Sequence, residues 1–447
     1  MSTAIANWVV SLTSTSLPAT VSQAALRSFY NWAGCTVGGA AHPATTIASR
    51  TLSRFFGPPT STLLGCRLDT KVIDAQHAAL INGIASHVHD YDDTHLDTII
   101  HPTGPVAAAL LSVCETLHRP IPGNDFLLAL IAGIEVECKL GLAVWPSHYD
   151  VGWHITSTTG SIGAAVAVSK ILGLTSEQTA HAIGLAATQV TGLREMFGSH
   201  TKSFHPGRAA QNGLLAALLA EEGYTSSLQA LEAKRGWVNV SSEEALANLH
   251  IQVDSLGKTW ETEKNSFKPF PCGIVIHPVI DGCISLHRKH LTSSEEIVSV
   301  MLTVHPLVLE LTGKKYPRDG LEAKFSVYHG AAVGLLLGKA TPAQYEDAVV
   351  LDPHLVQLRD RIAAVADPSL RPDECHITLT FENGARLEKH VDHAVGSVHR
   401  PMTDAQLQAK FLDQCVPVLG VDRANRASDW CWGLEARDDI RSIHEVL

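Results

Sequence analysis

Residues 124–145 read NDFLLALIAGIEVECKLGLAVW, and this stretch is apolar around most of the circumference that a helix would have. A helix that is apolar on nearly every side is a buried one, and small side chains allow it to pack closely against its neighbours. Asn124 and Ser176 are predicted to begin helices, with Gly123 and Gly173 in the short breaks before them. The same Ala-rich pattern predicts further buried helices over residues 22–40, 71–90, 104–118, 159–174 and 176–190.

The pattern of apolar residues changes after the segment NSFKPFPCG at 265–273. Strands are indicated where apolar and polar residues alternate, over 296–306, 375–381 and 385–393. The last two are separated by Glu382-Asn383-Gly384, which predicts a hairpin turn. Helices are predicted over 322–339, 353–367 and 403–415. We therefore predict a mainly α fold, with a large all-helical domain formed by residues 1–267 and 399–447 and a smaller α+β lid domain at 268–398.

The composition excludes several classes of protein. The 447 residues are 45% hydrophobic and 18% charged, with a formal net charge of −11, and no basic run is present that would neutralise the phosphates of nucleic acids or anionic membranes. Nine cysteines lie without CxxC or zinc-type spacing, as in a reducing compartment. The N-terminus lacks the basic start of a signal peptide, and no uninterrupted 18-residue apolar stretch occurs. We expect a cytoplasmic protein, with an organellar address left open.

Residues 87–102, HVHDYDDTHLDTIIHP, hold four histidines and four aspartates, and three interpretations of them are open. Two carboxylates and a histidine could bind a transition metal, and Asp92, Asp93 and Asp97 resemble the DDxxD pattern of prenyl-diphosphate enzymes. That pattern belongs within a helix, whereas the threonines and the final proline here indicate a helix end followed by a loop. The other interpretations are a solvated polar loop and a site for metal-free acid–base chemistry.

Two later segments place polar groups between apolar helices. His154 precedes a Ser/Thr-rich turn that opens a helix, whose N–H groups could receive a carboxylate. The alternative is an ordinary loop histidine, with Thr156 or Ser157 as the N-cap. Further along, a dense cationic cluster indicates anion recognition or, equally, a basic surface loop. This cluster comprises Arg194, His200, Lys202, His205 and Arg208.

Two more segments surround the proposed domain boundary. Lys268 and His277 lie in an otherwise apolar stretch at that boundary, and ligand sites are common at domain junctions. Taken alone, His277 is more typical of a core histidine. Tyr316 could donate a proton or be an ordinary interface aromatic residue. The cationic residues near it are Lys315, Arg318 and Lys324.

Five segments taken in order resemble one family, MmgE/PrpD. They are HVHDYDDTHLDTIIHP, GWHITSTTG, TKSFHPGRAAQNG, FKPFPCGIVIHP and YPRDGLEAKFS, and the resemblance covers roughly residues 5–415. It implies a large helical domain, a smaller lid, a homodimer and an active site at the domain junction. It also implies chemistry without a metal or an organic cofactor.

The resemblance assigns roles to individual residues. His101, His154 and His277 are the implied proton carriers, because histidine titrates near neutral pH. Asp90 is expected to orient or charge a neighbouring histidine, and Thr94 to hydrogen-bond to substrate or to that histidine. Carboxylate binding falls to Lys202, Lys268 and Arg318, and Tyr316 is a further catalytic candidate. His87, His89 and His95 receive no role.

These residues predict a lyase that acts on a small citrate-type tricarboxylate by proton transfer next to a carboxylate. We favour a 2-methylcitrate (alkylcitrate) dehydratase, although the sequence itself does not choose between dehydration and decarboxylation of a cis-aconitate-type substrate. An epimerase or isomerase of a related dicarboxylate could use the same acid–base groups without elimination. A third hypothesis is a metal-dependent hydrolase or prenyl-type enzyme that uses the aspartate cluster.

Overall fold

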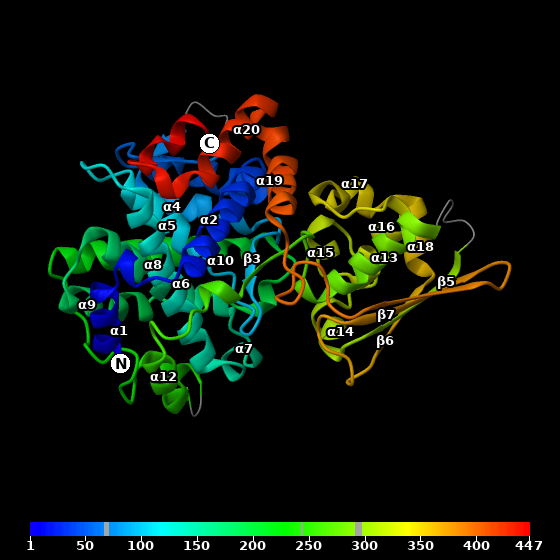
Figure 1. The fold of residues 1–447 in the computed structure, drawn as a ribbon, viewed down its shortest axis with the longest axis horizontal. Coiled ribbons are helices and arrows are strands. Elements are labelled where there is room, and N and C mark those ends of the chain that lie inside the picture. The colour runs from blue at the N-terminus through cyan, green and yellow to red at the C-terminus, as the bar shows by residue number, and fades with distance from the viewer. Residues whose placement is uncertain (67–70, 243–244, 291–296) are drawn as a thin grey trace. The chain divides into compact units, whose positions relative to one another are not determined.

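The structure, a computed structural model, describes residues 1–66, 71–242, 245–290 and 297–447. The chain forms two compact units. The first comprises Met1–Val88, Asp92–Ser266 and Asp404–Leu447, and the second comprises His89–Tyr91 and Phe267–Thr403. The predicted fold class is confirmed, because long helices form most of the first unit and the second contains a four-stranded sheet with helices (Figure 1).

The first unit consists mainly of helices that are apolar on most sides, as predicted. The longer ones are α2 (Ala19–Gly39), α4 (Ala75–His87), α5 (Thr103–Cys114), α6 (Gly123–Val144), α8 (Ile155–Leu172), α9 (Ser176–Ala187), α10 (His200–Glu221) and α19 (Asp404–Leu419). Shorter ones are α1 (Ser2–Ser11), α3 (Pro43–Leu52), α7 (Ser147–Asp150), α11 (Trp237–Ser241), α12 (Ala245–Asp254) and α20 (Val421–Trp432). A small two-stranded sheet pairs β1 (Ser61–Thr62) with β2 (Val72–Ile73), and a second includes β3 (Asp93–His95) and β4 (Asn265–Phe267).

Close packing of α4 against α10 depends on two glycines. A Cβ atom on Gly83 would lie 2.5 Å from the Cα of Gly207, and a Cβ on Gly207 would lie 2.3 Å from the carbonyl oxygen of Leu80. Neither distance leaves room for a side chain, so the two backbones touch because both positions are glycine. This contact fixes the spacing between the end of α4, which carries His87, and the start of α10, which carries Lys202.

The helix starts differ in part from the sequence prediction. α8 begins directly after His154, which is its N-cap, so Thr156 and Ser157 lie inside the helix and neither is the cap. α6 begins at Gly123, one residue before Asn124. α9 begins at Ser176 as predicted, and a capping box between Thr175, its N-cap, and Gln178, in its first turn, closes this end. Helix starts are set by a few local hydrogen bonds, and the apolar pattern that locates a helix does not fix them.

The second unit contains a four-stranded sheet in the order β6-β5-β7-β8. β5 (Ile297–Val304) pairs in parallel with β6 (Ile362–Ala366) and antiparallel with β7 (Cys375–Phe381), which pairs antiparallel with β8 (Arg386–Val391). Figure 1 shows α13 (His277–His290) and α16 (Val327–Leu337) lying together over the sheet. Shorter helices are α14 (Pro306–Thr312), α15 (Gly320–Ala323), α17 (Asp347–Val350) and α18 (Pro353–Asp360).

Two predictions for the second unit are wrong in detail. The predicted helix 353–367 ends at Asp360, and residues 362–366 form β6 instead. The reason is tertiary pairing, because Val300 of β5 aligns with Ile362 and the parallel ladder continues to Ala366. The predicted helix 322–339 is interrupted, since the Ser326 side chain accepts the N–H of His329 and starts α16. The hairpin between β7 and β8 is confirmed, with Gly384 in the left-handed region at φ 79°.

Among the described residues, α8 is long and apolar enough by length and composition to cross a membrane. The protein itself buries 89% of this helix, and its neighbours are α6 and α10. Such burial is equally typical of a helix in a protein core, and one such helix is weak support for a membrane span.

Candidate active site

The predicted site residues fall into two groups, one in each unit. The first unit holds Thr94, His101, His154 and Lys202, and the second holds Asp90, Lys268, His277, Tyr316 and Arg318.

The histidine-rich segment forms an ordered loop between α4 and α5. His95 stabilises this loop through its backbone and its ring. The backbone N–H of His95 donates to the carbonyl of Ile100. The ring lies 2.7 Å from the Thr98 hydroxyl and 3.1 Å from a carboxylate oxygen of Glu261. Ile99 has a left-handed backbone at φ 59°, which is unfavourable for a β-branched residue and reverses the chain there. The loop therefore has one defined shape, and His95 supports that shape.

His101 is buried and has a defined tautomer. Its Nδ1 lies 2.7 Å from the backbone carbonyl oxygen of Asp93. A carbonyl oxygen can only accept, so Nδ1 carries a proton, and the neutral ring has its lone pair on Nε2. The Thr94 hydroxyl lies 3.2 Å from the same Nδ1, and the backbone N–H of His101 donates to Thr156. The neutral ring is thus set to accept a proton at Nε2.

A buried carboxylate lies between His101 and a second imidazole. The Nδ1 atom of His87 is 2.7 Å from Asp92 Oδ2, and the other oxygen of Asp92 is 3.7 Å from His101 Nδ1. The ring centres of His87 and His101 are 4.8 Å apart, and that of His154 is 5.9 Å from His87 and 6.4 Å from His101. A carboxylate in this position stabilises an imidazolium at either neighbouring ring.

A fourth imidazole fixes His154 at the start of α8. The Nδ1 atoms of His154 and His205 are 2.9 Å apart, so one of them donates and the other accepts. Burial, then the charges of His205 and Lys202, hold the pKa of His154 well below its ordinary value. Burial likewise lowers the pKa of His205 to about 4, with contributions from His87 and Lys202. Both rings are therefore neutral near neutral pH and share one proton between their Nδ1 atoms. We call His87, His101, His154 and His205 the histidine cluster.

Lys202 brings a positive charge to this cluster. Its ammonium nitrogen is 5.2 Å from the ring centre of Phe197, whose edge packs against His154 at a ring-centre distance of 5.0 Å. The side chain is largely buried, so its charge is less screened than it would be in water. Such a charge beside neutral imidazoles favours an anion.

Asp93 holds the loop that leads to His101. Its Oδ2 accepts the N–H of Thr103 at 3.3 Å and the Thr103 hydroxyl at 2.5 Å, and it also accepts from the Asn265 amide. Burial, followed by the charge of Asp92, raises the pKa of Asp93 to about 6. Asp93 thus anchors the loop to the start of α5, and its carbonyl fixes His101.

The candidate residues of the second unit form a buried ion pair. The Lys268 ammonium lies 2.6 Å from Asp90 Oδ1 and 3.2 Å from the Asp90 carbonyl. Asp90 has a left-handed backbone at φ 52°, a conformation that costs free energy for a residue with a side chain. His277 begins α13, with its ring edge-on to Phe270 at 5.4 Å. The expected action of Asp90 on a histidine stays a prediction.

Tyr316 and Arg318 are placed differently from that pair. Tyr316 is 69% exposed, and the Arg318 side chain is 83% exposed. The Arg318 guanidinium donates to both carboxylate oxygens of Glu322, one turn further along. Their assigned roles in catalysis and substrate binding stay predictions.

The chain matches two family models that together span most of its length. The model of the MmgE/PrpD N-terminal domain matches residues 3–250, and that of the MmgE/PrpD C-terminal domain matches residues 270–434. The chain belongs to the MmgE/PrpD family. The resemblance noted in the five sequence segments is confirmed.

Curated relatives within the MmgE/PrpD family are lyases on tricarboxylates. Human cis-aconitate decarboxylase is 28% identical over 384 residues, which cover 83% of this chain and 79% of the human protein. The cis-aconitate decarboxylase of Aspergillus terreus is 24% identical over 468 residues, covering 99% and 95% of the two chains. The 2-methylcitrate dehydratase of Escherichia coli strain K12 is 25% identical over 360 residues, covering 73% and 72%. The chain is a lyase of this family, and these matches support the decarboxylase alternative better than the dehydratase that we favoured.

The MmgE/PrpD resemblance left part of the site unassigned. The additional residues are His87, Asp92, Phe197 and His205. One signal was available in the sequence: His205 follows Lys202 by three positions, and such residues share a face of a helix. The pairing of His87 with Asp92 offered no periodic signal, because it depends on the course of an irregular loop.

The histidine cluster also has donors that suit a metal ion. His87, His101 and His154 each offer a ring nitrogen, and these three atoms lie within 4.8 Å of one another. The hydrogen bonds at Nδ1 to Asp92, to the Asp93 carbonyl and to His205 resemble the second-shell bonds that orient histidine ligands through their other nitrogen. The residues therefore fit a transition metal, and the metal-free chemistry implied by the family resemblance stays a prediction.

Proposed function

We propose that this lyase decarboxylates a cis-aconitate-type tricarboxylate, with the histidine cluster and Lys202 as its reactive centre. The observation that carries the proposal is the hydrogen bond from His101 Nδ1 to the Asp93 carbonyl, which leaves Nε2 of a buried ring for proton transfer. The human and Aspergillus terreus relatives, both named cis-aconitate decarboxylase, support the choice of substrate.

The reaction creates and then quenches a carbanion. Loss of CO₂ breaks the bond between a substrate carbon and the leaving carboxylate, and the electron pair stays on the substrate, conjugated with its double bond. The carbanion then takes one proton on carbon, and the product keeps the two other carboxylates. Because the intermediate is densely negative, fixed cations and N–H donors directed at it lower the barrier. Lys202 is the cation of the first unit that we assign to this task.

The cluster has two sides with different electrostatics. Asp92 lies within hydrogen-bonding distance of His87 and close to His101, so an imidazolium on this side is stabilised. His154, next to Lys202 and bonded to His205, is neutral. We assign delivery of the proton to the Asp92 side, with His101 as the ring that exchanges it through Nε2. Neutral His154 hydrogen-bonds to a substrate carboxylate.

The second unit contains residues to which the family resemblance assigns roles, as follows. Lys268 binds a substrate carboxylate and His277 carries a proton. Asp90 already pairs with the Lys268 ammonium at 2.6 Å, so a substrate carboxylate competes with Asp90 for that charge. Replacing Lys268 by Met removes the positive charge that attracts both Asp90 and the substrate carboxylate. We expect a higher KM as the main effect.

The deciding experiment offers cis-aconitate, citrate and 2-methylcitrate separately to the purified chain in D₂O. We expect cis-aconitate to lose the mass of CO₂ and its product to gain one carbon-bound deuterium. Loss of water from citrate or 2-methylcitrate, without CO₂ release from cis-aconitate, would show a dehydratase instead. Unchanged mass with altered stereochemistry would show an epimerase. Either of these results overturns the proposal.

Two further measurements test what the family resemblance implies. Metal analysis of the active protein tests the metal-free reaction: a stoichiometric transition metal, lost together with activity under chelation, would overturn it. Light scattering at several concentrations tests the implied homodimer.

A further inference from the structure

We propose that the sheet of the second unit binds one divalent transition-metal ion of the zinc class through His376, His390 and Glu374. His376 lies on β7 and His390 on β8, and their Cα atoms are direct partners across the antiparallel ladder. The two rings stack with centres 4.3 Å apart and planes within 9°. Two histidines opposite each other on paired strands present both imidazoles to one point, on a backbone already fixed by ladder hydrogen bonds.

The two histidines are on the face of the sheet that is away from α13, which we call the outer face. Ile377 and Val391 mark the inner face, because a Cβ on Gly282 of α13 would lie 2.5 Å and 3.0 Å from their side chains. Side chains alternate along a strand, so the neighbouring positions, His376 and His390, point outward. Both histidines are exposed, and 46% of the His390 side-chain surface is accessible to solvent.

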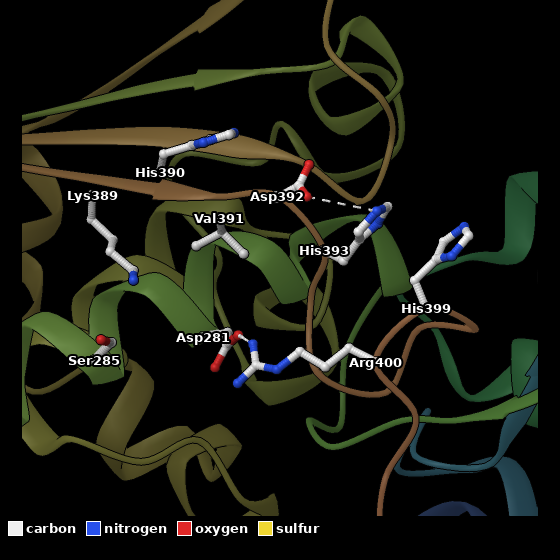
Figure 2. Close-up of a pocket in the computed structure, with 9 residues that line it drawn as sticks. All are labelled: Asp281, Ser285, Lys389, His390, Val391, Asp392, His393, His399 and Arg400. Atoms are coloured by element: carbon white, nitrogen blue, oxygen red, sulfur yellow. Dashed lines mark hydrogen bonds and ion pairs between the residues drawn. The ribbon is translucent and has the colours of Figure 1, made fainter.

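Figure 2 shows the same alternation on β8. Lys389 turns toward the helix that carries Ser285, and His390 leaves the strand on its other side. Both residues line a pocket of about 370 Å³, which is also lined by Arg400 and its ion-pair partner Asp281. The outer face of the sheet presents the two imidazoles to solvent.

Glu374 completes the donor set. Its Oε1 lies 2.9 Å from Nε2 of His390, and its side chain is only 12% exposed. One donor atom from each of the three residues lies within 4.8 Å of the others. Metal–nitrogen and metal–oxygen bonds of about 2.0–2.2 Å place tetrahedral donors roughly 3.4 Å apart. Rotation of the two exposed imidazoles would bring the donors closer to that spacing without moving the strands.

The donor types identify the class of ion. Two imidazoles and one carboxylate suit Zn²⁺, Co²⁺, Ni²⁺ or Cu²⁺, whereas Ca²⁺ and Mg²⁺ prefer oxygen ligands. A solvent molecule takes the fourth position, because the outer face is exposed. A bound ion would join β8 to β7 and stabilise the folded second unit, since it binds that state and not the separated strands. This site is independent of the proposed decarboxylation.

The test is calorimetric titration of the full chain with Zn²⁺, repeated with Co²⁺ and followed by visible absorption of the cobalt. Two variants remove one ligand each, His376→Gln and His390→Gln. A matched control, His354→Gln, changes an exposed histidine on α18 of the same unit. The variant His101→Gln reports any binding by the histidine cluster.

We expect one equivalent of metal to bind at least tenfold more weakly in both ladder variants and with unchanged affinity in the His354 and His101 variants. Any second equivalent that only His101→Gln removes belongs to the histidine cluster. Far-UV circular dichroism of the metal-free variants checks that they fold, and we expect spectra like that of the unaltered chain because both positions are exposed. Zinc should also raise the melting temperature of the unaltered chain more than that of either ladder variant. Binding that is weakened less than tenfold in either ladder variant would overturn the proposal.

Discussion

The carboxyl group of Asp93 makes stability depend on pH with a definite sign. Asp93 is fully buried, and burial, then the charge of Asp92, raises its pKa from an ordinary 3.8 to about 6. Since the folded chain holds this proton more tightly than the unfolded chain, its contribution to stability is present below about pH 3.8 and is lost as the pH rises to about 6. Asp93→Asn removes this loss, because an amide does not ionise and its oxygen can still accept from Thr103.

The size of the effect follows from the two pKa values. They differ by about 2.2, which at ~1.36 kcal/mol per pKa unit corresponds to about 3 kcal/mol of lost stability above pH 6. Roughly half of that loss is already present at pH 5. We therefore compare the free energy of unfolding of Asp93→Asn with that of the unaltered chain. The variant's value minus that of the unaltered chain should increase by about 1 kcal/mol from pH 5 to pH 7.

The assay is urea unfolding at pH 5, 6 and 7, followed by circular dichroism, with the two proteins compared at each pH. The difference between them cancels the titration of groups that both share. Asp97→Asn is the matched control, because Asp97 lies in the same loop and is exposed, and it is compared with the unaltered chain in the same way. The reasoning is refuted if the unfolding free energy of Asp93→Asn minus that of the unaltered chain stays constant or decreases as the pH rises.

Three further changes test the packing and the chemistry of the first unit. His101→Gln should lower kcat by about 10²–10⁴-fold with little change in stability, because it removes the ring that delivers the proton through Nε2. Near-normal turnover would exclude this role. His205→Leu should lower kcat by roughly 10–100-fold, because His154 loses the hydrogen bond that positions it. His205→Gln keeps a hydrogen-bonding group and should restore part of the lost kcat. Equal rates for the two variants would indicate that His205 acts only through packing. Gly207→Ala should destabilise the protein by about 1–3 kcal/mol in urea unfolding, because its Cβ would meet the Leu80 carbonyl at 2.3 Å.

The helices of the first unit were predictable because their signal is local. α6 and α8 are apolar on most sides, and that pattern needs no knowledge of their partners. β6 was missed for the opposite reason. Its residues, IAAVA, suit either a helix or a strand, and pairing with β5, about sixty residues earlier in the chain, decides between them.

The candidate site was predictable in its residue types and only partly in its contacts. The family pattern selects Thr94, His101 and His154, and the structure brings Thr94 to 3.2 Å from the ring of His101. The partners of these residues come from tertiary structure. His205 reaches His154 because α10 packs against α8, and no spacing along the sequence encodes that contact.

The cluster cannot hold a second proton on every imidazole, and this limit assigns the imidazolium to one side of the cluster. His154 and His205 share a single proton between their Nδ1 atoms, and Lys202 disfavours another charge there. An additional proton is therefore stabilised best beside Asp92, at His87 or His101. Asp92→Asn should lower kcat about 10-fold or more and move the alkaline fall of the pH–rate profile to lower pH, because the imidazolium loses its carboxylate. A profile that keeps its position while only its height changes would place the reacting proton elsewhere.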